Sequence, residues 1–241
     1  MTFDVYEFSN QGGRSYNEDA IGSIVKENSG IFVVADGLGG HSFGELASAC
    51  ALDTMLENWK PEEEGRDAWL EMQSKEANQR ILKLQEEKKT VLKSTVVALA
   101  IDGTQAVWAH VGDSRLYYLH HGWIHSITED HSVAYKKYKA GEITREAIAW
   151  DEDQSCLLRT LGGTERYEAQ VCVCEEILEP GDAFLLCSDG AWEYLRDGEI
   201  PIDLLKAQNA KQWTELMLLR MMDRINGDND NLSMLTVMLK E

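Results

Sequence analysis

Ile31-Phe32-Val33-Val34-Ala35 runs directly into Asp36-Gly37-Leu38-Gly39-Gly40-His41. The apolar residues predict a β-strand, and the glycine-rich step after them predicts a turn. Asp36 therefore stands at the end of an apolar strand and not on a solvated face. A carboxylate in that place is costly to dehydrate unless it is ion-paired, hydrogen-bonded or bound to a cation. The stretch thus predicts both a strand of the fold and the start of a site.

Acidic residues also stand at the ends of other strand-like segments. A single Asp-Gly step is usually only a turn. Several carboxylates carried to strand ends together are hard to explain as turns, and they predict side chains that converge on one site. These acids are Asp113, Asp189, Asp230 and the adjacent pair Glu18 and Asp19.

The donor atoms that these residues offer are almost all oxygens, including the backbone carbonyl of the permissive Gly37. Zinc prefers His or Cys ligands, whereas an oxygen cage suits Mg²⁺ or Mn²⁺ with several retained waters. So many carboxylates predict two ions, which together lower the pKa of a bridging water and clamp a phosphoryl group for in-line attack. The pattern therefore predicts metal-dependent chemistry on a phosphate.

Two further residues near the acids have side chains that suit a phosphate substrate. Arg14 follows Gly12-Gly13 and precedes Glu18 by four residues, so its guanidinium is the expected fork for phosphate oxygens. His41 lies five residues after Asp36 and is the candidate acid that protonates the leaving alkoxide, because imidazole titrates near neutrality. Taken singly, His41 is more commonly explained as an N-terminal residue of the next helix.

The rest of the chain predicts antiparallel strands covered by helices. Short turns at Asp102-Gly103 and His121-Gly122 favour hairpins over a continuous β-α-β alternation. Apolar residues recur with helical spacing over residues 45–59, 67–87 and 212–225. Strands are expected over residues 3–8, 20–25, 31–35, 95–101, 106–111, 115–119, 183–187 and 232–239.

The composition excludes several classes of protein. The 241 residues include 42 Asp and Glu against 23 Lys and Arg, and the net charge of -19 repels nucleic-acid phosphates. No apolar run approaches the roughly 18 residues that a membrane helix needs, and the amino-terminal segment lacks the pattern of a secretory signal. The five cysteines form no Cys-x-x-Cys pair, and none has the Arg six residues later that thiolate phosphatases use. We expect a soluble, cytoplasmic protein with reduced thiols.

A series of motifs along the chain resembles, in order, that of the metal-dependent Ser/Thr protein phosphatases of type 2C, the PPM family. The resemblance spans residues 8–240 and looks like the compact bacterial branch. The motifs are Arg14-Ser15-Tyr16-Asn17-Glu18-Asp19-Ala20, Ala35-Asp36-Gly37-Leu38-Gly39-Gly40-His41, Gly112-Asp113-Ser114-Arg115, Asp130-His131-Ser132, Leu158-Arg159-Thr160-Leu161-Gly162, Ser188-Asp189-Gly190-Ala191-Trp192 and Asp230-Asn231-Leu232-Ser233.

The resemblance assigns the acids to individual metal sites. It implies that Asp36 bridges two ions, with the Gly37 carbonyl assisting, and that Asp189 and Asp230 complete the first site. The pair Glu18-Asp19 would serve the second ion. These roles agree with the oxygen cage that the residues themselves predict.

Further implications concern a third ion and the fold. Bacterial relatives hold a looser third ion, for which Asp113 and Asp189 are the matching positions, and Glu193 stands where the family often has another acid. The implied fold is α+β: a sandwich of two antiparallel β-sheets flanked by helices, as a single domain over residues 1–241. Residues 131–161 would form a flap beside the active site, which in the family influences substrate choice.

The implied activity is that of a Mg²⁺- or Mn²⁺-dependent protein phosphatase. It would hydrolyse phosphoserine and phosphothreonine by direct attack of a metal-activated water, with Asp36, Arg14 and His41 as catalytic residues. The partners would be Ser/Thr-phosphorylated proteins, including a cognate Ser/Thr kinase or its substrates. We expect a monomer that binds neither nucleic acid nor membrane.

Some features depart from this interpretation or leave it open. Where the family has a small Gly-Thr-Thr-like step the chain has Lys93-Ser94-Thr95, and we expect Lys93 to extend outward. Residues 135–139 give the flap a basic face that suits an acidic phosphosite or is simply a solvated helix face. A non-catalytic phosphoprotein-binding member is an alternative. A dinucleotide-binding loop at residues 37–40 is another, although Ser42 replaces the third glycine and Asp36 would repel a pyrophosphate.

Overall fold

The apolar run in strand β3 (Ser29–Leu38) is buried on both of its faces. Phe32 and Val34 point into a hydrophobic layer that also contains residues of a second sheet. Ile31, Val33 and Ala35 point to the opposite face and pack in a layer with helical residues. Successive side chains of a strand face opposite ways, so an uninterrupted apolar run requires apolar packing on both sides. β3 therefore belongs to an inner layer of the molecule.

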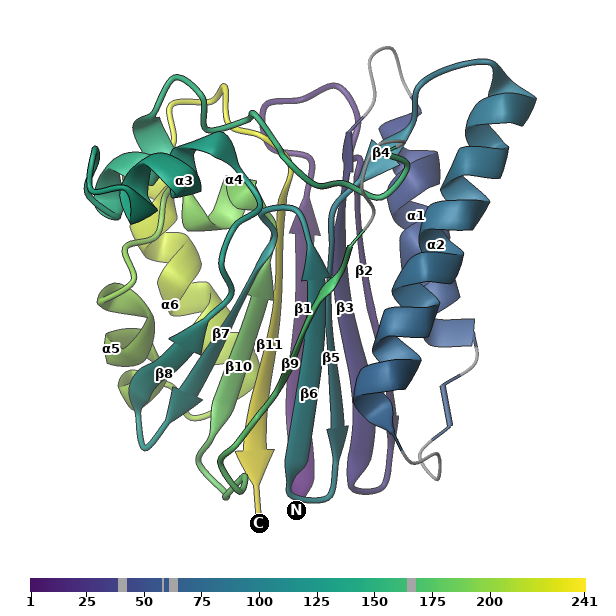
Figure 1. Cartoon of the computed structure of the whole chain (residues 1–241). Helices are drawn as coiled ribbons and strands as arrows, with labels where there is room; N and C mark the ends of the chain where they lie inside the picture. Colours follow the sequence, from purple (N-terminus) through teal and green to yellow (C-terminus); the bar gives the residue numbers. More distant parts are fainter. Residues whose placement is uncertain (39–42, 58, 61–64, 164–167) are drawn as a thin grey trace.

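The computed structural model describes residues 1–38, 43–57, 59–60, 65–163 and 168–241 and has four layers, with helices outside two packed sheets (Figure 1). Every strand pairing is antiparallel. One sheet has the order β1 (Thr2–Asn10), β11 (Leu232–Lys240), β10 (Ala183–Cys187), β7 (Arg115–His120) and β8 (Trp123–Ile127). The other has the order β2 (Asp19–Lys26), β3, β5 (Val96–Asp102), β6 (Gln105–Val111) and β9 (Gln170–Val173), and β4 (Lys93–Ser94) pairs with β3.

Each sheet is covered on its outer face by its own helices (Figure 1). The long helices α1 (Gly44–Glu57) and α2 (Arg66–Lys88) pack on the β3 sheet. The β11 sheet is covered by α3 (Val133–Lys139), the 3₁₀ helix η1 (Glu146–Trp150), α4 (Asp189–Trp192), α5 (Glu199–Lys206) and α6 (Ala210–Met222). No helix in the described part of the chain is long and apolar enough to cross a membrane.

The fold predicted from the sequence is confirmed. All eight expected strands and all three expected helices are present, with ends shifted by a few residues. The antiparallel neighbours of β3 also exclude the dinucleotide loop, which requires a parallel sheet. The sequence reasoning missed the short elements β4, β8, β9, η1, α4 and α5.

The segment predicted as a flap, residues 131–161, contains α3 and η1 and is bound to the sandwich. A bridge between Ser132 and Leu157 closes the segment on itself, and Leu161 bridges to Ser94 at β4. The basic face expected on α3 is largely neutralised, because Lys137 is ion-paired with Asp151 and Asp153, and Lys139 with Glu129. Lys93 is half-buried in β4 opposite Leu38.

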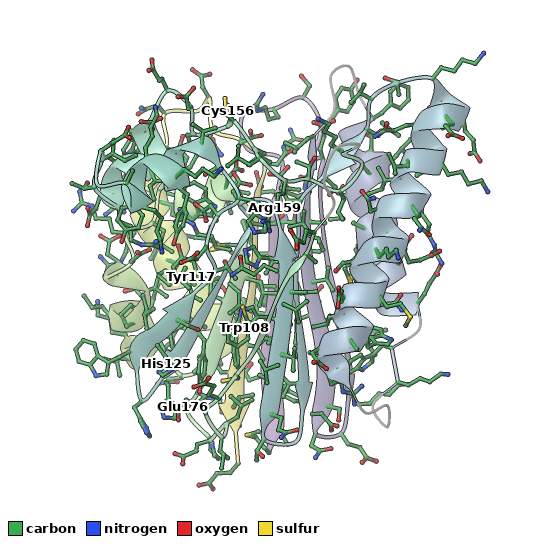
Figure 2. All side chains as sticks on the ribbon, in the orientation of Figure 1. Trp108, Tyr117, His125, Cys156, Arg159 and Glu176 are labelled. Carbon is green, nitrogen blue, oxygen red and sulfur yellow. The ribbon has the colours of Figure 1, made fainter. Side chains whose placement is uncertain are left out.

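The two ends of the sandwich carry different parts of the chain: the termini lie at one end and the predicted acids at the other. The chain termini lie at the lower end in Figure 1, so β1 finishes and β11 begins at the upper end, where Asn10 pairs with Leu232. Figure 2 shows Cys156 and Arg159 toward this upper end and His125 and Glu176 toward the lower end. The predicted acids all belong to the upper end.

Candidate metal centre

Strand register brings the predicted acids together at one end of the sandwich. Asp19 in β2 is the register partner of Asp36 in β3. In the other sheet β7, β10 and β11 are neighbours, and the strand ends that lead to Asp113, Asp189 and Asp230 meet at one edge. We call the eight residues with predicted ligand atoms the metal centre: Glu18, Asp19, Asp36, Gly37, Asp113, Asp189, Glu193 and Asp230.

Burial and mutual repulsion raise the pKa values of Asp19, Asp36, Asp113, Asp189 and Glu193. Burial, followed by the charges of Asp189 and Asp19, raises the pKa of Asp36 well above its usual range. The pKa of Asp113 is also raised well above it, by burial and then by Asp189. Burial raises the pKa of Asp19 to about 7, of Asp189 to about 6 and of Glu193 to about 8. So many acids in one buried place are stable as anions only beside positive charge.

The backbone of Asp36 is hydrogen-bonded to Ser94 of β4 and to Thr95, which precedes β5. Its N–H donates to Thr95 Oγ1 at 3.0 Å, and its carbonyl accepts from Thr95 N at 2.8 Å and from Ser94 Oγ at 2.9 Å. Thr95 Oγ1 is in turn 2.7 Å from Ser114 Oγ. The Ser94-Thr95 step therefore positions Asp36, although the preceding Lys93 departs from the family pattern.

Glu18 and the Gly37 carbonyl face a common point at the start of α1. Gly44 N donates to Glu18 Oε1 at 3.0 Å, and Gly37 N donates to the Glu18 carbonyl at 3.1 Å. A Cβ atom on Gly44 would lie 2.6 Å from Glu18 Oε1 and 2.7 Å from the Gly37 carbonyl oxygen. Only glycine fits there, and its absent side chain leaves the two oxygens facing the same space.

Asp19 has one carboxylate oxygen with a hydrogen bond and one without. Oδ2 accepts from Ser188 Oγ at 2.8 Å, while the buried Oδ1 has no hydrogen-bond partner among the described residues. Ser188 is itself held by Ser233, whose N–H donates to Ser188 Oγ at 3.0 Å. A buried carboxylate oxygen without a partner is the donor atom that a cation needs, so the donor set fits a hard divalent metal.

Asp113 is held through the backbone on both sides of it. Gly112, at φ 102°, donates its N–H to His131 Nδ1 at 3.2 Å and accepts from the His131 N–H at 2.9 Å. The Asp113 carbonyl accepts from Trp192 Nε1 at 2.9 Å. Because Nδ1 of His131 is an acceptor, the imidazole is neutral with its proton on Nε2, which is 3.3 Å from Gln170 Oε1.

The buried ion pair of Arg115 with Asp130 packs against Trp192 and supports this arrangement. The Arg115 guanidinium donates two bonds to Asp130, at 2.8 and 2.7 Å, and both side chains are almost fully buried. The same guanidinium lies 3.6 Å from the centroid of the Trp192 ring. The dipeptide Asp130-His131 thus fixes Asp113 from two directions.

Arg14 lies at the exposed rim of the metal centre. Its Nη2 donates to Asp230 Oδ2 at 2.6 Å, and the side chain is 58% exposed. The hydrogen bond and charge of Asp230 raise the pKa of Arg14, so it is always a cation. The guanidinium therefore keeps free N–H groups for an anionic ligand while it contacts a predicted metal ligand.

The carboxylates do not close into a compact metal-binding group. Among the described residues no three His, Cys, Asp or Glu side chains form a ready cluster for one ion. Mg²⁺ typically retains several waters and takes only one or two carboxylates. The oxygen donor set suits hydrated Mg²⁺ or Mn²⁺ better than zinc, which prefers His and Cys. His41 lies outside the described residues.

Three residues that position the acids were not singled out by the sequence reasoning. Asn231 Oδ1 accepts from Glu18 N at 2.8 Å, and its Nδ2 donates to the carbonyls of Gln11 and Tyr16 at 2.8 Å each. Ser188 holds Asp19, and Thr95 holds the backbone of Asp36. Ser188 and Asn231 are adjacent to predicted ligands in the sequence, so that adjacency is the signal that points to them.

Comparison with known proteins identifies the family of the chain. The family model described as protein phosphatase 2C matches residues 9–232. The serine/threonine phosphatase stp of Listeria welshimeri is 32% identical over 241 residues, covering 96% of this chain and 94% of that protein. The protein phosphatase PhpP of Streptococcus pneumoniae is 32% identical over 197 residues, covering 78% of each.

Solved structures of bacterial phosphatases match the fold of this chain over almost its whole length. The S. agalactiae serine/threonine phosphatase has a TM-score of 0.86 and 26% identity, covering 99% of this chain and all of that one. The catalytic domain of the phosphatase PstP in complex with two manganese ions has a TM-score of 0.82 and 25% identity, covering 99% of both chains. The chain therefore belongs to the protein phosphatase 2C (PPM) family, in its bacterial branch, and is a metal-dependent serine/threonine phosphatase.

Proposed function

We propose that the metal centre binds two Mg²⁺ or Mn²⁺ ions and a third, weaker one, and that the enzyme removes phosphate from phosphoserine and phosphothreonine in proteins. Asp36 and the Gly37 carbonyl would serve the first two ions, with Asp189 and Asp230 on one of them. Glu18 and Asp19 would serve the other. Asp113 and Asp189 would hold the third, with Glu193 nearby. The observation that supports this most strongly is the buried Oδ1 of Asp19, which lacks a hydrogen-bond partner in the described part of the chain and lies among acids of raised pKa.

The chemistry that we propose is a single displacement by water. Bound divalent ions supply positive charge to the phosphoryl group and lower the pKa of water. Arg14 binds phosphate oxygens, and His41 protonates the leaving alkoxide. No side chain is placed as a nucleophile among the described residues near the acids: Cys187 is buried with a raised pKa, and the hydroxyl of Ser188 is bonded to Asp19.

The proposal extends to partners and setting. Substrates are proteins carrying phosphoserine or phosphothreonine, and a cognate Ser/Thr kinase or its own substrates are among them. We propose that the enzyme acts in the cytoplasm as a monomer. Light scattering coupled to gel filtration tests the monomer, with a mass near 27.2 kDa expected.

Hydrolysis assays test the proposed reaction. The purified protein should hydrolyse p-nitrophenyl phosphate and a phosphothreonine peptide with Mn²⁺ or Mg²⁺, and EDTA should abolish the activity. Trapping with acid quench should recover no phosphoenzyme. A covalent phosphoprotein, or activity that survives complete metal removal, contradicts the mechanism.

A further inference from the structure

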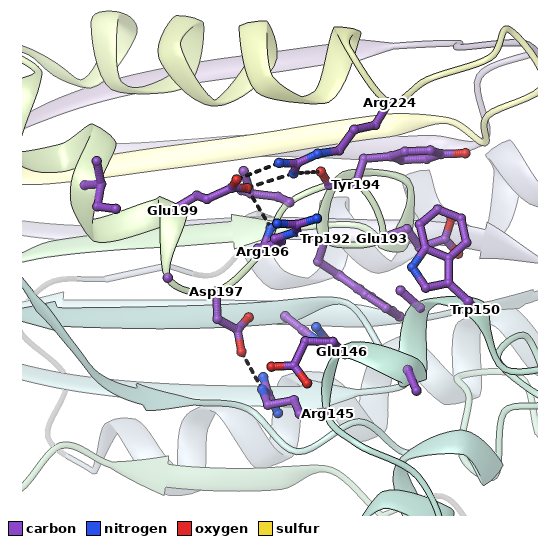
Figure 3. Close-up of a pocket in the computed structure, with 16 residues that line it drawn as sticks. Arg145, Glu146, Trp150, Trp192, Glu193, Tyr194, Arg196, Asp197, Glu199 and Arg224 are labelled. Atoms are coloured by element: carbon purple, nitrogen blue, oxygen red, sulfur yellow. Dashed lines mark hydrogen bonds and ion pairs between the residues drawn. The ribbon is translucent and has the colours of Figure 1, made fainter.

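A cavity of about 810 Å³ lies between η1 and the segment that joins α4 to α5. Figure 3 shows its wall, with Trp150 and Tyr194 on one side and the ion pairs of Arg224 and Arg145 on the other. Ile202 of α5 also lines it. No part of the mechanism proposed above uses this cavity, which we call the Trp150 pocket.

The Trp150 pocket adjoins the metal centre at α4. Trp192 and Glu193 line the pocket. Trp192 also donates to the Asp113 carbonyl, and Glu193 N donates to the Asp189 carbonyl at 3.0 Å. The pocket therefore lies where residues that flank a phosphorylated side chain held at the metal centre can reach it.

The charged groups of the pocket largely neutralise one another. Three arginines that line it are each committed to a carboxylate. These ion pairs are Arg115 with Asp130, Arg145 with Asp197, and Arg224 with Glu199.

Three lining charges make no ion pair within the described residues. Glu193 belongs to the metal centre, where a bound cation would offset it. The exposed Glu146 and Arg196 carry opposite charges. The pocket thus offers a ligand little net charge.

What the pocket does offer is aromatic surface. Trp150 is 67% exposed, and its ring packs edge-on against Tyr194, with centroids 5.9 Å apart and an angle of 86°. Ala147, Ala149 and the 47% exposed Ile202 complete an apolar lining. A concave site with an exposed indole and balanced charges suits an apolar or aromatic side chain.

We propose that the Trp150 pocket binds a bulky apolar or aromatic side chain of the phosphoprotein, close to the phosphorylated residue, and so selects among substrates. This inference rests on the phosphatase function proposed above. A cavity of this volume is on the order of 9 Å across, which two or three extended residues span at about 3.3 Å each. Because Glu193 belongs to both the pocket wall and the metal centre, the side chains to test are those within about three residues of the phosphorylated one.

Two tryptophan variants test the proposal. Trp150→Ala removes the proposed contact, whereas Trp123→Ala removes an equally exposed indole, at 71%, at the opposite end of the sandwich in β8. Both should hydrolyse p-nitrophenyl phosphate like the wild type, because this substrate has no flanking residues. For a phosphothreonine peptide with Phe or Leu within three residues of the phosphothreonine, Trp150→Ala should lower kcat/KM about tenfold through KM. Trp123→Ala should not.

A second peptide, with Ala in place of the bulky residue, completes a double-mutant cycle. The wild type should lose about tenfold on this peptide, and Trp150→Ala should lose nothing further, because both changes remove one contact. Trp150→Phe should retain most of the preference for the bulky residue. Equal kcat/KM on both peptides for the wild type, or an equal loss of p-nitrophenyl phosphate hydrolysis in Trp150→Ala, overturns the proposal.

A binding measurement separates this proposal from the phosphatase function. If the wild type hydrolyses no phosphate ester, the proposed function fails, and the pocket is still testable by calorimetric titration of both peptides into the wild-type protein with Mn²⁺, which does not turn them over. The bulky peptide should bind about tenfold more tightly than the Ala peptide, and Trp150→Ala should remove that difference. Equal affinities contradict the pocket.

Discussion

Asn231 illustrates what a single side chain contributes to this site. Its amide bonds three backbone groups of the segment that precedes β2, and so it fixes the position of Glu18. The sequence places Asn231 beside Asp230, and this adjacency marks it as part of the site. Its hydrogen bonds depend on how residues 11–18 fold back on it, which no periodicity or propensity specifies. The acids could be predicted from their places at strand ends, whereas the residues that hold them could not.

The hydrogen bond from Gly112 to His131 leads to a prediction at the same scale. His131→Asn keeps an acceptor near the position of Nδ1, whereas His131→Gln places its amide further along, where Nε2 now lies. Asn should therefore preserve the Gly112-Asp113 turn, and Gln should loosen it. Calorimetric Mn²⁺ titration should show the weakest site lost or weakened about tenfold in Gln and near wild-type in Asn.

A purely structural role for His131 gives a different outcome. Both variants would then have lower thermal stability and the same Mn²⁺ isotherm as the wild type. Identical isotherms in His131→Asn and His131→Gln contradict the positioning of Asp113 by His131. p-Nitrophenyl phosphate hydrolysis as a function of Mn²⁺ concentration provides an independent readout.

Among the secondary-structure elements, the core strands and long helices were predicted and the short edge elements were not. β3, β10 and β11 carry apolar runs that are buried on both faces, so their sequence signal is strong. β9 has four residues, each half-buried or exposed, and it is fixed by pairing with β6 and not by its own pattern. The segment 131–161 was predicted as a flap, and its packing against Ser94 and Gly112 comes from tertiary contacts.

The junction of β6 with the start of the 131–161 segment predicts a pH dependence of stability. His131 stacks on His110 with ring centroids 4.6 Å apart, and burial, then the charge of His110, lowers the pKa of His131 to about 4. In the unfolded chain it titrates near 6.5. Below pH 6.5 the unfolded state therefore binds a proton that the folded state does not, and stability falls as pH drops toward 4.

Comparison of the wild type with His131→Asn isolates the contribution of His131 protonation to stability. The free energy of unfolding of the wild type should lose about 2 kcal/mol from His131 between pH 7.5 and pH 5. Urea titrations of wild type and His131→Asn should show the difference between them shrinking by that amount as the pH is lowered. A difference that is constant over this range contradicts a neutral, buried His131.

At the scale of the whole molecule, part of the net charge of -19 is gathered at the metal centre. The sequence predicted that acids converge, and the layered fold explains how: antiparallel register brings strand ends from both sheets to one end of the sandwich. Seven carboxylates of the metal centre contribute to the charge there, and Arg14 is ion-paired with one of them. The site is therefore repulsive by itself and favourable only with bound cations.

This repulsion predicts that Asp36→Asn changes the melting temperature in opposite directions, relative to the wild type, without and with metal. Burial beside other acids raises the pKa of Asp36, and this costs the metal-free fold stability at neutral pH. Asp36→Asn removes that cost, so in EDTA the variant should melt a few degrees higher than the metal-free wild type. With 5 mM Mn²⁺ the wild type should gain several degrees, because ions bind the folded state, and the variant should gain little. Scanning calorimetry of both proteins measures this. A metal-free variant that melts below the metal-free wild type contradicts the repulsion.

The central claim, that carboxylates of the metal centre hold divalent ions which the reaction requires, is tested most directly by counting ions. Equilibrium dialysis against Mn²⁺, followed by elemental analysis, should find about two or three ions for each wild-type chain. Asp36→Asn should hold fewer than about one and should hydrolyse neither p-nitrophenyl phosphate nor a phosphothreonine peptide. An Asp36→Asn protein that binds as many ions as the wild type and remains active would contradict the account.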